Sequence, residues 1–381
     1  MKKLVFSLML LGTIGTVFTS CSDDDSDNNG PTPPEEATLE GEITADMTLD
    51  EETTYTIKGP VYVNSGVTLT IPAGTRLEGY AEADATAVAF LAVKQGGKIM
   101  AQGSAANPIV LTSSKANPSP GDWGGIVICG SAKTNLGTNV QAEVTGLTYG
   151  GNNPADNSGI YSYLKVEYAG ALINPDAEFN GVTFYAVGSG TTVNNILVYQ
   201  GSDDAFEWFG GSVGGSNLVG IGCQDDTFDW TEGWNGTVTN MYSNQAPALA
   251  FSADSRGLEA DSNQNNPTVA PISNPTLSNI TLIGRNNAAV TSEVGMMLRR
   301  GTNGMISNVV IKDFKGTGSV AVKFDGAESQ AWFALHPVTG VKTENVLANT
   351  NGFDASISLN ANATGAGNGT AVPAWAAWMN L

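Results

Sequence analysis

The sequence contains few basic residues, few cysteines and a single histidine, and each shortage excludes a class of function. Among its 381 residues, 37 Asp and Glu outnumber 17 Lys and Arg, so the net charge is −20. Nucleic acid is therefore not expected as a partner, because contacts to phosphates require basic side chains. Three cysteines do not make a disulfide framework, and the cysteines and the single histidine lack the spacing of a zinc site. We expect Cys129 and Cys223 to be buried, unpaired thiols.

Long apolar runs are missing from the body of the chain, so no transmembrane helix is expected there. The one apolar run, LVFSLMLLGTIGTVF (Leu4–Phe18), is short and follows Lys2 and Lys3, as in a secretory signal peptide. It ends in FTSC, which places Cys21 where a bacterial lipoprotein carries its acylated cysteine. An ordinary signal peptide with a coincidental cysteine is the alternative.

The residues after Cys21 read SDDDSDNNGPTPPEE, a polar and acidic stretch that suits a flexible tether. We predict a lipoprotein signal peptide over residues 1–20, and the acylated Cys21 with its flexible acidic tether over residues 21–45. The SDDD sequence resembles the export signal of Bacteroidota lipoproteins that reach the outer face of the outer membrane. This resemblance implies a lipid anchor as the only membrane attachment and a location facing the cell exterior.

Helical periodicity is also absent from the rest of the chain. Instead, short β-branched pieces such as VTLTI, PIVLT, GIVI and NILVY alternate with Gly, Asn or Pro, and the chain has 46 Gly. Similar residues recur at a spacing of 22, in pairs such as Leu69 and Leu91, Phe184 and Phe206, and Phe206 and Phe228. A fixed period of this size indicates stacked repeats.

This pattern predicts an all-β fold, a right-handed parallel β-helix in which one chain winds with about 22 residues per coil. We place this domain at residues 46–381. A β-propeller is the alternative, but its blades need a period of about 40 to 50 residues. The apolar tail AVPAWAAWMNL is expected to cap the last open coil, because an exposed sheet edge invites aggregation.

A recurring asparagine predicts one corner of the coils. It precedes an aliphatic residue in six segments, and asparagine tolerates left-handed backbone and can bond to the asparagine of the next coil. The six positions are Asn195, Asn217, Asn240, Asn279, Asn308 and Asn345. Irregular stretches at residues 133–158, 262–275 and 329–339 interrupt the repeat, and we expect them to be loops that leave the corners and shape a groove.

Two acidic segments, GSDDAFEWFGG and CQDDTFDWTEG, repeat at the same spacing of 22. If Phe206 and Phe228 point inward, strand alternation places Glu207 and Asp229 on the outer surface, one above the other. Extending this row along the coils predicts the vertical order Tyr185, Glu207, Asp229, Glu259, Arg299. No Lys or Arg occurs between Lys165 and Arg256, whereas 11 acids do, so the stretch cannot neutralise itself.

Three interpretations of this acidic repeat remain open. In the first, Ca²⁺ binds among carboxylates, with Asp203, Glu207, Asp225, Asp226 and Asp229 as the ligands. In the second, the Asp pairs are turn-formers that bond to nearby backbone N–H groups. In the third, they are the catalytic acids of a polysaccharide-cleaving enzyme. Because the pattern repeats on successive coils, we favour shared metal binding or shared turn chemistry over a single catalytic pair.

Aromatic and basic residues near the acids complete the expected ligand surface. The alternation that buries Phe206 also buries Trp208 and Trp230, whereas Trp234 is expected to form an exposed platform. The candidate ligand-binding residues are Tyr185, Trp234, Glu259 and Arg299. Arg299 suits either a lyase-type base or a structural ion pair with Glu259. The only histidine, His336, is expected in a solvated loop.

Several motifs together resemble a known family. The lipidation site with its acidic tail occurs with NPIVLTS, GDWGGIVI, GVTFYAVGSGTTVNNILVYQGSDDAFEWFGG and DDTFDWTEGW. The combination resembles β-helix surface lipoproteins of Bacteroidota, which share the fold of the pectate-lyase-like superfamily. This resemblance implies the fold but no established activity.

We therefore expect a surface-exposed outer-membrane lipoprotein that acts as a non-catalytic binding or scaffold protein. A glycan is the expected ligand, because β-helices present long faces to linear polymers, and Ca²⁺ is the expected cofactor. One alternative is a polysaccharide lyase or glycoside hydrolase of the β-helix type. Another is a structural or partner-protein role beside an outer-membrane importer.

Overall fold

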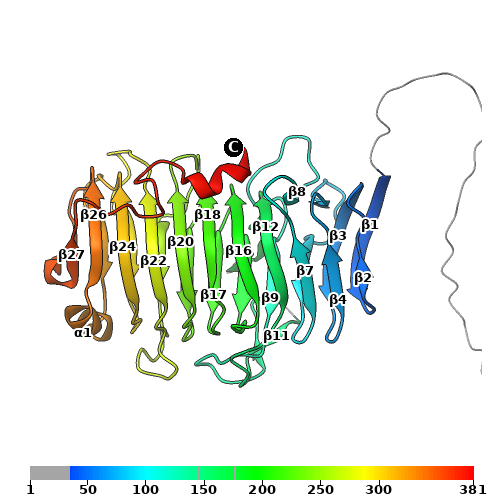
Figure 1. Ribbon diagram of the computed structural model, residues 1–381, viewed down its shortest axis with the longest axis horizontal. Coiled ribbons are helices and arrows are strands. Elements are labelled where there is room, and N and C mark those ends of the chain that lie inside the picture. Colours follow the sequence, from blue (N-terminus) through cyan, green and yellow to red (C-terminus); the bar gives the residue numbers. More distant parts are fainter. Residues whose placement is uncertain (1–34, 145, 176) are drawn as a thin grey trace, which may run out of the picture. The chain divides into compact units, whose positions relative to one another are not determined.

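The computed structural model describes residues 35–381 apart from 145 and 176, and these residues form a solenoid of stacked parallel strands (Figure 1). The predicted signal peptide, Cys21 and most of the predicted tether lie outside the described residues. The main sheet contains 23 strands, and nearly all of its pairings join one coil to the next in parallel. The prediction of an all-β, right-handed parallel β-helix is confirmed.

One row of strands consists mainly of long members that bend around a corner, visible side by side in Figure 1. The row contains β2 (Met47–Thr48), β4 (Thr68–Ile71), β7 (Lys98–Gln102), β12 (Gly159–Glu167), β16 (Thr192–Tyr199), β18 (Gly215–Ile221), β20 (Thr237–Asn244), β22 (Thr276–Ile283), β24 (Met305–Lys312), β26 (Val338–Glu344) and β27 (Ile357–Leu359). The second half of β12 pairs with β8 (Ile109–Ser113), and β8 pairs in turn with β5 (Arg76–Gly79) of the preceding coil. Each long strand therefore covers two faces of the solenoid.

A third face carries the short strands on which the acidic segments lie. Its members are β6 (Phe90–Val93), β9 (Ile126–Cys129), β15 (Val182–Tyr185), β17 (Phe206–Phe209), β19 (Phe228–Thr231), β21 (Arg256–Ala260), β23 (Val294–Leu298) and β25 (Val320–Phe324). At the start of the solenoid, β1 (Glu35–Ile43) pairs with β3 (Thr53–Val63). The described strands thus begin at Glu35, within the segment predicted to be a tether, because the TLEGEI segment pairs with β3.

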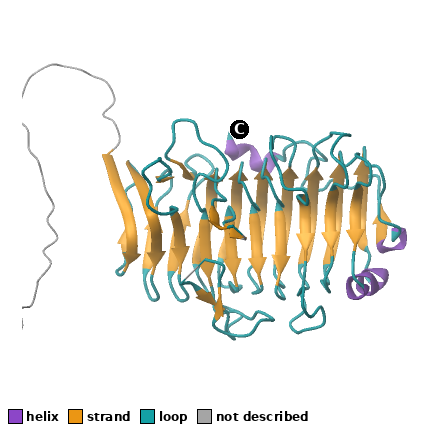
Figure 2. Ribbon diagram, turned by 180° about the vertical axis from the view of Figure 1, so that it is seen from behind, coloured by secondary structure: helices purple, strands orange, loops and turns teal. Residues whose placement is uncertain are grey.

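The remaining elements leave the solenoid at its corners or ends. Two antiparallel hairpins, β10–β11 (Val140–Gln141, Thr148–Tyr149) and β13–β14 (Leu172–Asn174, Ala177–Glu178), project from the coils. The helix α1 (Ala327–Leu335) and the short 3₁₀ helices η1 (Asp354–Ser356) and η2 (Ala374–Met379) complete the described chain (Figure 2). No helix in this part of the chain is both long and apolar enough to cross a membrane.

Aromatic side chains stack along the interior, coil upon coil. Phe206 lies 5.6 Å from Phe228 between ring centroids, and both are fully buried. The 22-residue spacing is correct for this pair, but Phe184 stacks on Trp208 rather than on Phe206. The predicted pairing of Leu69 with Leu91 is also wrong, because Leu69 pairs with Ile99. Leu69 and Leu91 are inward positions on different faces. Phe184 and Phe206 lie on paired strands of one face, but their register is shifted by two residues.

The asparagine corner is confirmed for five of the six predicted positions. Asn195, Asn217, Asn240, Asn279 and Asn308 all have positive φ. The last four amides each donate to the preceding one, for example Asn240 Nδ2 to Asn217 Oδ1 at 2.7 Å. We call these five residues the asparagine ladder. The sixth, Asn345, sits at a different corner and donates to Asn286 and Asp313.

The apolar tail covers a lateral surface, so the predicted cap over the last coil is wrong. The chain from Thr364 onward runs back along the solenoid. Thr364 contacts Asn308 and Gly369 contacts Thr281, and within the tail the carbonyl oxygen of Met379 accepts from Lys165. Trp378 and Met379 belong to one buried cluster with apolar residues of β16, β18 and β20, and the C-terminal segment lies alongside these strands in Figure 1. These outward apolar side chains need cover more than the terminal coil does. Cys129 and Cys223 are buried and unpaired, as predicted.

Candidate functional site

The strands of the third face hold the acidic row in the predicted register. Glu207 pairs with Asp229 and Asp229 with Glu259, so these carboxylates are stacked on the outer surface of β17, β19 and β21. We call these three residues the carboxylate row. The two ends of the predicted order are wrong. Thr183, not Tyr185, precedes Glu207, and Met297, not Arg299, follows Glu259, because the register is shifted by two residues at each end.

The Asp pairs lie just before these strands, where the coil turns. Asp204 Oδ1 accepts the backbone N–H of Asp226 at 2.8 Å, and Asp226 Oδ1 accepts the backbone N–H of Arg256. Each second Asp thus supports the backbone of the next coil rather than its own turn. The turn interpretation is correct to this extent, but it uses only one oxygen of each of these carboxylates.

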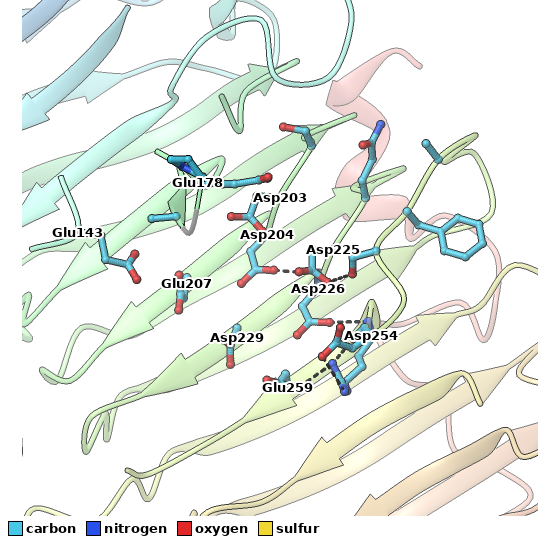
Figure 3. A pocket seen from close by; sticks show the side chains of 18 residues that line it. Glu143, Glu178, Asp203, Asp204, Glu207, Asp225, Asp226, Asp229, Asp254 and Glu259 are labelled. Atoms are coloured by element: carbon cyan, nitrogen blue, oxygen red, sulfur yellow. Dashed lines mark hydrogen bonds and ion pairs between the residues drawn. The ribbon is translucent and has the colours of Figure 1, made fainter. Parts of the chain in front are cut away.

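The row and the pairs line a cleft of about 650 Å³ that is dominated by carboxylates (Figure 3). Only one basic side chain, Arg256, lines it. Hairpin β13–β14 contributes Glu178, and the loop before β21 contributes Phe251 and Asp254. The ten acids are Glu143, Glu178, Asp203, Asp204, Glu207, Asp225, Asp226, Asp229, Asp254 and Glu259.

Within the cleft, oxygen atoms approach closely enough to share cations. Three groups of carboxylates have ligand atoms within 4.8 Å of one another. All five residues predicted as metal ligands belong to one of these groups. The groups are Asp203, Asp204 and Asp225; Asp204, Glu207 and Asp229; and Asp226, Asp229 and Glu259.

Burial makes ionisation of these acids unfavourable. It raises the pKa of Asp203 to about 8, with further contributions from the charges of Asp225 and Glu178. Burial and the neighbouring Asp229 raise the pKa of Glu207 well above its usual range, and the pKa of Asp204 rises for the same reasons, with Asp203 as its nearest acidic neighbour. Near neutral pH, the cleft must therefore hold protons or bind cations.

The downstream end of the row is neutralised by arginine. Glu259 pairs with Arg256 Nη1 at 2.8 Å and also with Arg299. Arg299 Nε contacts Asp261 at 2.7 Å, and Arg300 contacts the same carboxylate at 2.7 Å. Asp261, Arg299 and Arg300 line a second, smaller cleft of about 300 Å³, which shares Glu143, Glu207, Asp229 and Glu259 with the first.

Two predicted ligand-binding residues are not available to a ligand. Trp234 is fully buried, stacks on Trp208 at 4.7 Å and donates its indole N–H to the carbonyl of Val213 at 2.9 Å. Tyr185 is 2% exposed, and its hydroxyl donates to Glu143. Both aromatic rings fill space between elements, so the exposed-platform prediction is wrong. Glu259 and Arg299 do line a cleft, as an ion pair.

His336 lies just after α1 and stacks on Trp332 with ring centroids 3.9 Å apart. It lines neither cleft. The position is the C-terminal end of a helix rather than the irregular loop that was predicted.

The sequence did not indicate several residues of the cleft. Glu143 and Glu178 come from hairpin insertions, whereas Asp254 comes from the segment before β21 and Arg256 is the first residue of that strand. Asp204 was not among the predicted ligands, although it is the neighbour of Asp203 and belongs to two of the three carboxylate groups. The recurring DD pair was the signal for Asp204, whereas loop residues carry no periodic signal.

Comparison with known proteins gives one finding on the family. A family model described as a pectate-lyase-like β-helix domain matches residues 41–379. No curated protein and no solved structure matches the chain.

Proposed function

Since the chain belongs to the family of pectate-lyase-like β-helix domains, we propose that it is a non-catalytic, Ca²⁺-dependent glycan-binding protein. It is anchored by lipid at Cys21 and faces the cell exterior. One observation carries the proposal. The main cleft gathers ten carboxylates around a single guanidinium, and burying so many like charges is unfavourable without cations.

Calcium suits this cleft better than the other common metals. The side chains that line it offer carboxylate, amide and hydroxyl oxygens rather than imidazole or thiolate, and hard cations prefer oxygen. Ca²⁺ accepts six to eight oxygen ligands in flexible geometry, whereas Mg²⁺ requires a tight octahedron. Each carboxylate group provides three residues, so coordination positions stay open for water or for a ligand.

A glycan fits the open positions and the surroundings of the cleft. Hydroxyl or carboxylate oxygens of a sugar can complete the coordination of Ca²⁺. Phe251 lies at the cleft and is 38% exposed, and the Arg285 guanidinium lies 3.8 Å from its ring centroid on one side. This supported ring offers an apolar surface to a sugar ring. The family's pectate-lyase-like fold is consistent with a carbohydrate-related role.

The enzyme alternative has one observation in its favour. A carboxyl group such as Asp203, with a pKa raised to about 8, can act as a general acid at neutral pH. A lyase-type base is harder to find, because Arg256, Arg299 and Arg300 all form ion pairs with Glu259 or Asp261. We therefore place binding ahead of cleavage.

A glycan panel tests both glycan binding and glycan cleavage. We expect one or more glycans to bind in Ca²⁺ and to be released by chelator, with no new reducing ends and no absorbance at 235 nm from unsaturated products. Cleavage products would establish the enzyme instead. Binding that is unaffected by chelator would remove calcium from the mechanism. Capture of an outer-membrane importer without any glycan would favour the partner-protein role.

Thermal unfolding tests the metal independently of any glycan. Ca²⁺ at about 100 times its dissociation constant stabilises the folded state by roughly 2.7 kcal/mol. We expect chelation to lower the apparent midpoint at a fixed scan rate, and Mg²⁺ to restore it poorly. The double change Asp225→Asn with Asp226→Asn should diminish the chelator effect. An unchanged midpoint in chelator, with no heat of Ca²⁺ binding, would leave the acids as turn chemistry alone.

Localisation needs a separate experiment. We expect labelled palmitate to be incorporated into the protein and lost in Cys21→Ala. Added protease should digest the protein on intact cells. Protection from protease on intact cells would contradict the surface location.

A further inference from the structure

We infer that the acidic cleft holds two divalent cations bridged by Asp204, which rests on the proposed Ca²⁺-dependent function and deepens it. One cation lies among Asp203, Asp204 and Asp225, and the other among Asp204, Glu207 and Asp229. We call the first group the upper triad and the second the lower triad (Figure 3).

The spacing of the oxygens assigns the triads to separate ions. Ca²⁺ binds oxygens at about 2.3–2.6 Å, so two ligands of one ion lie at most about 5 Å apart. Ligand atoms within each triad fall within 4.8 Å of one another, which satisfies this limit. The five residues fall into two groups at this spacing rather than one, and only Asp204 belongs to both. The oxygens are therefore arranged for two ions that share Asp204 rather than for one ion that contacts all five residues.

The charge of the two triads also indicates two cations. The two triads contain five different carboxylates, and no salt bridge joins any of the five to a basic residue in the described chain. One divalent cation leaves most of this charge uncompensated, whereas two nearly neutralise it. Buried charge without compensation is costly, so a second cation is favoured after the first has bound.

Unsatisfied oxygens give an independent indication of a ligand. Asp204 is 6% exposed; Oδ1 accepts the Asp226 N–H, and the other oxygen receives no hydrogen bond from the described residues although the side chain lines the cleft. Asp229 Oδ1 is enclosed and has no hydrogen-bond partner in the same part of the chain. A buried carboxylate oxygen without a donor is unfavourable, and a metal ion satisfies it.

The third group of carboxylates is not a cation site. It consists of Asp226, Asp229 and Glu259, but Glu259 already binds Arg256 and Arg299. The Arg256 backbone also donates to Asp226. A third metal ion would have to displace these arginines from the cleft.

The number of bound ions tests the inference directly. The purified full-length chain is stripped with chelator and dialysed against Ca²⁺, and bound calcium is counted by emission spectrometry and by calorimetry. We expect two Ca²⁺ per chain. One ion per chain would overturn the bridged pair while leaving Ca²⁺ binding in place. No bound ion would overturn the proposed Ca²⁺ dependence as well.

Isosteric variants then assign the sites. Asp203→Asn should lose the upper ion and Glu207→Gln the lower one, so that each retains one Ca²⁺ per chain. Asp204→Asn should weaken both sites by at least about tenfold, because it removes the shared ligand. The control is Asp254→Asn, which lines the same cleft with a side chain that is 70% exposed and belongs to neither triad. It should retain two ions.

The variants also offer ways to contradict the bridge. Complete loss of calcium in both Asp203→Asn and Glu207→Gln would indicate a single site, as would unchanged binding in Asp204→Asn. Circular dichroism verifies that each variant is folded. The number of Ca²⁺ ions bound by the unmutated chain needs no substitution. It therefore tests the inference even if a variant fails to fold.

Discussion

Two columns of polar side chains run along this solenoid, and the polar atoms of each column are satisfied in a different way. The asparagine ladder stacks identical side chains through Asn240 and its neighbours, and each amide both donates and accepts. The carboxylate row stacks Glu207, Asp229 and Glu259 in register on another face. Ionised carboxylates only accept hydrogen bonds, so neighbours in this column repel rather than bond.

The carboxylate row itself changes along its length. At Glu259 the chain provides Arg256 and Arg299 as partners. At Glu207, the hydrogen-bond partner is the amide of Asn180, which donates at 2.6 Å, and no arginine among the described residues forms an ion pair with Glu207. A column of amides therefore satisfies its own hydrogen bonds, whereas a column of acids requires cations from the chain or from solution. Four predictions test this contrast.

The largest effect is expected where the chain supplies its own cation. Arg299→Met leaves Glu259 and Asp261, both 9% exposed at the side chain, without a principal partner. Removing one partner of a buried ion pair costs about 3–5 kcal/mol. Urea unfolding should show this loss. The control Arg300→Met removes a side chain that is 40% exposed, and it should cost under about 1 kcal/mol. Equal losses of unfolding free energy in the two variants would contradict the stronger dependence of the row on Arg299.

The asparagine ladder should respond next most strongly. Asn240→Ala removes the donor to Asn217 and the acceptor for Asn279, and places alanine at φ 62°. Losing these bonds and adopting left-handed backbone should together cost about 2–4 kcal/mol. Asn240→Gly restores the backbone freedom and should recover about 1 kcal/mol of this. An alanine variant as stable as the glycine variant would show that the backbone conformation is not strained.

The third prediction concerns pH in the presence of chelator. Burial raises the pKa of Glu232 from 4.5 to about 7, while Thr134 and Tyr149 donate to it. A raised pKa in the folded state contributes stability that is complete below the unfolded pKa and is lost as pH rises through the folded value. The apparent midpoint should therefore fall as the pH rises from about 4.5 to about 7. Glu232→Gln should reduce this slope, and a midpoint that rises over the same interval would contradict it.

The smallest effect is expected from relieving repulsion inside the row. In chelator, Asp229→Asn removes a charge beside Glu207 and Glu259, and should stabilise the chain by roughly 0.2–1 kcal/mol. In Ca²⁺ the same variant should be less stable than the unmutated chain, because it loses a ligand. Midpoints measured in both conditions give the sign of each change. The same sign in both would mean that no cation contacts Asp229.

The repeating parts of the molecule were the predictable parts. Glu207 over Asp229 and the corner at Asn195 follow from strand alternation and a shared spacing, which are properties of neighbouring residues. Predictions failed where the spacing changed. Tyr185 was assigned to the row because a constant period was extended into a coil of different length, and β15 places Thr183 there instead.

By itself, the sequence determined the solenoid, the outward direction of Glu207 and Asp229 and the burial of Trp208, because local alternation decides which side of a strand faces the core. Only the tertiary structure decided that Trp234 fills the interior, that the tail covers β16, β18 and β20, and that Arg299 reaches back to Glu259. Those contacts join residues from different coils and from loops of irregular length. Their distances depend on how every intervening coil is closed, which no local pattern records.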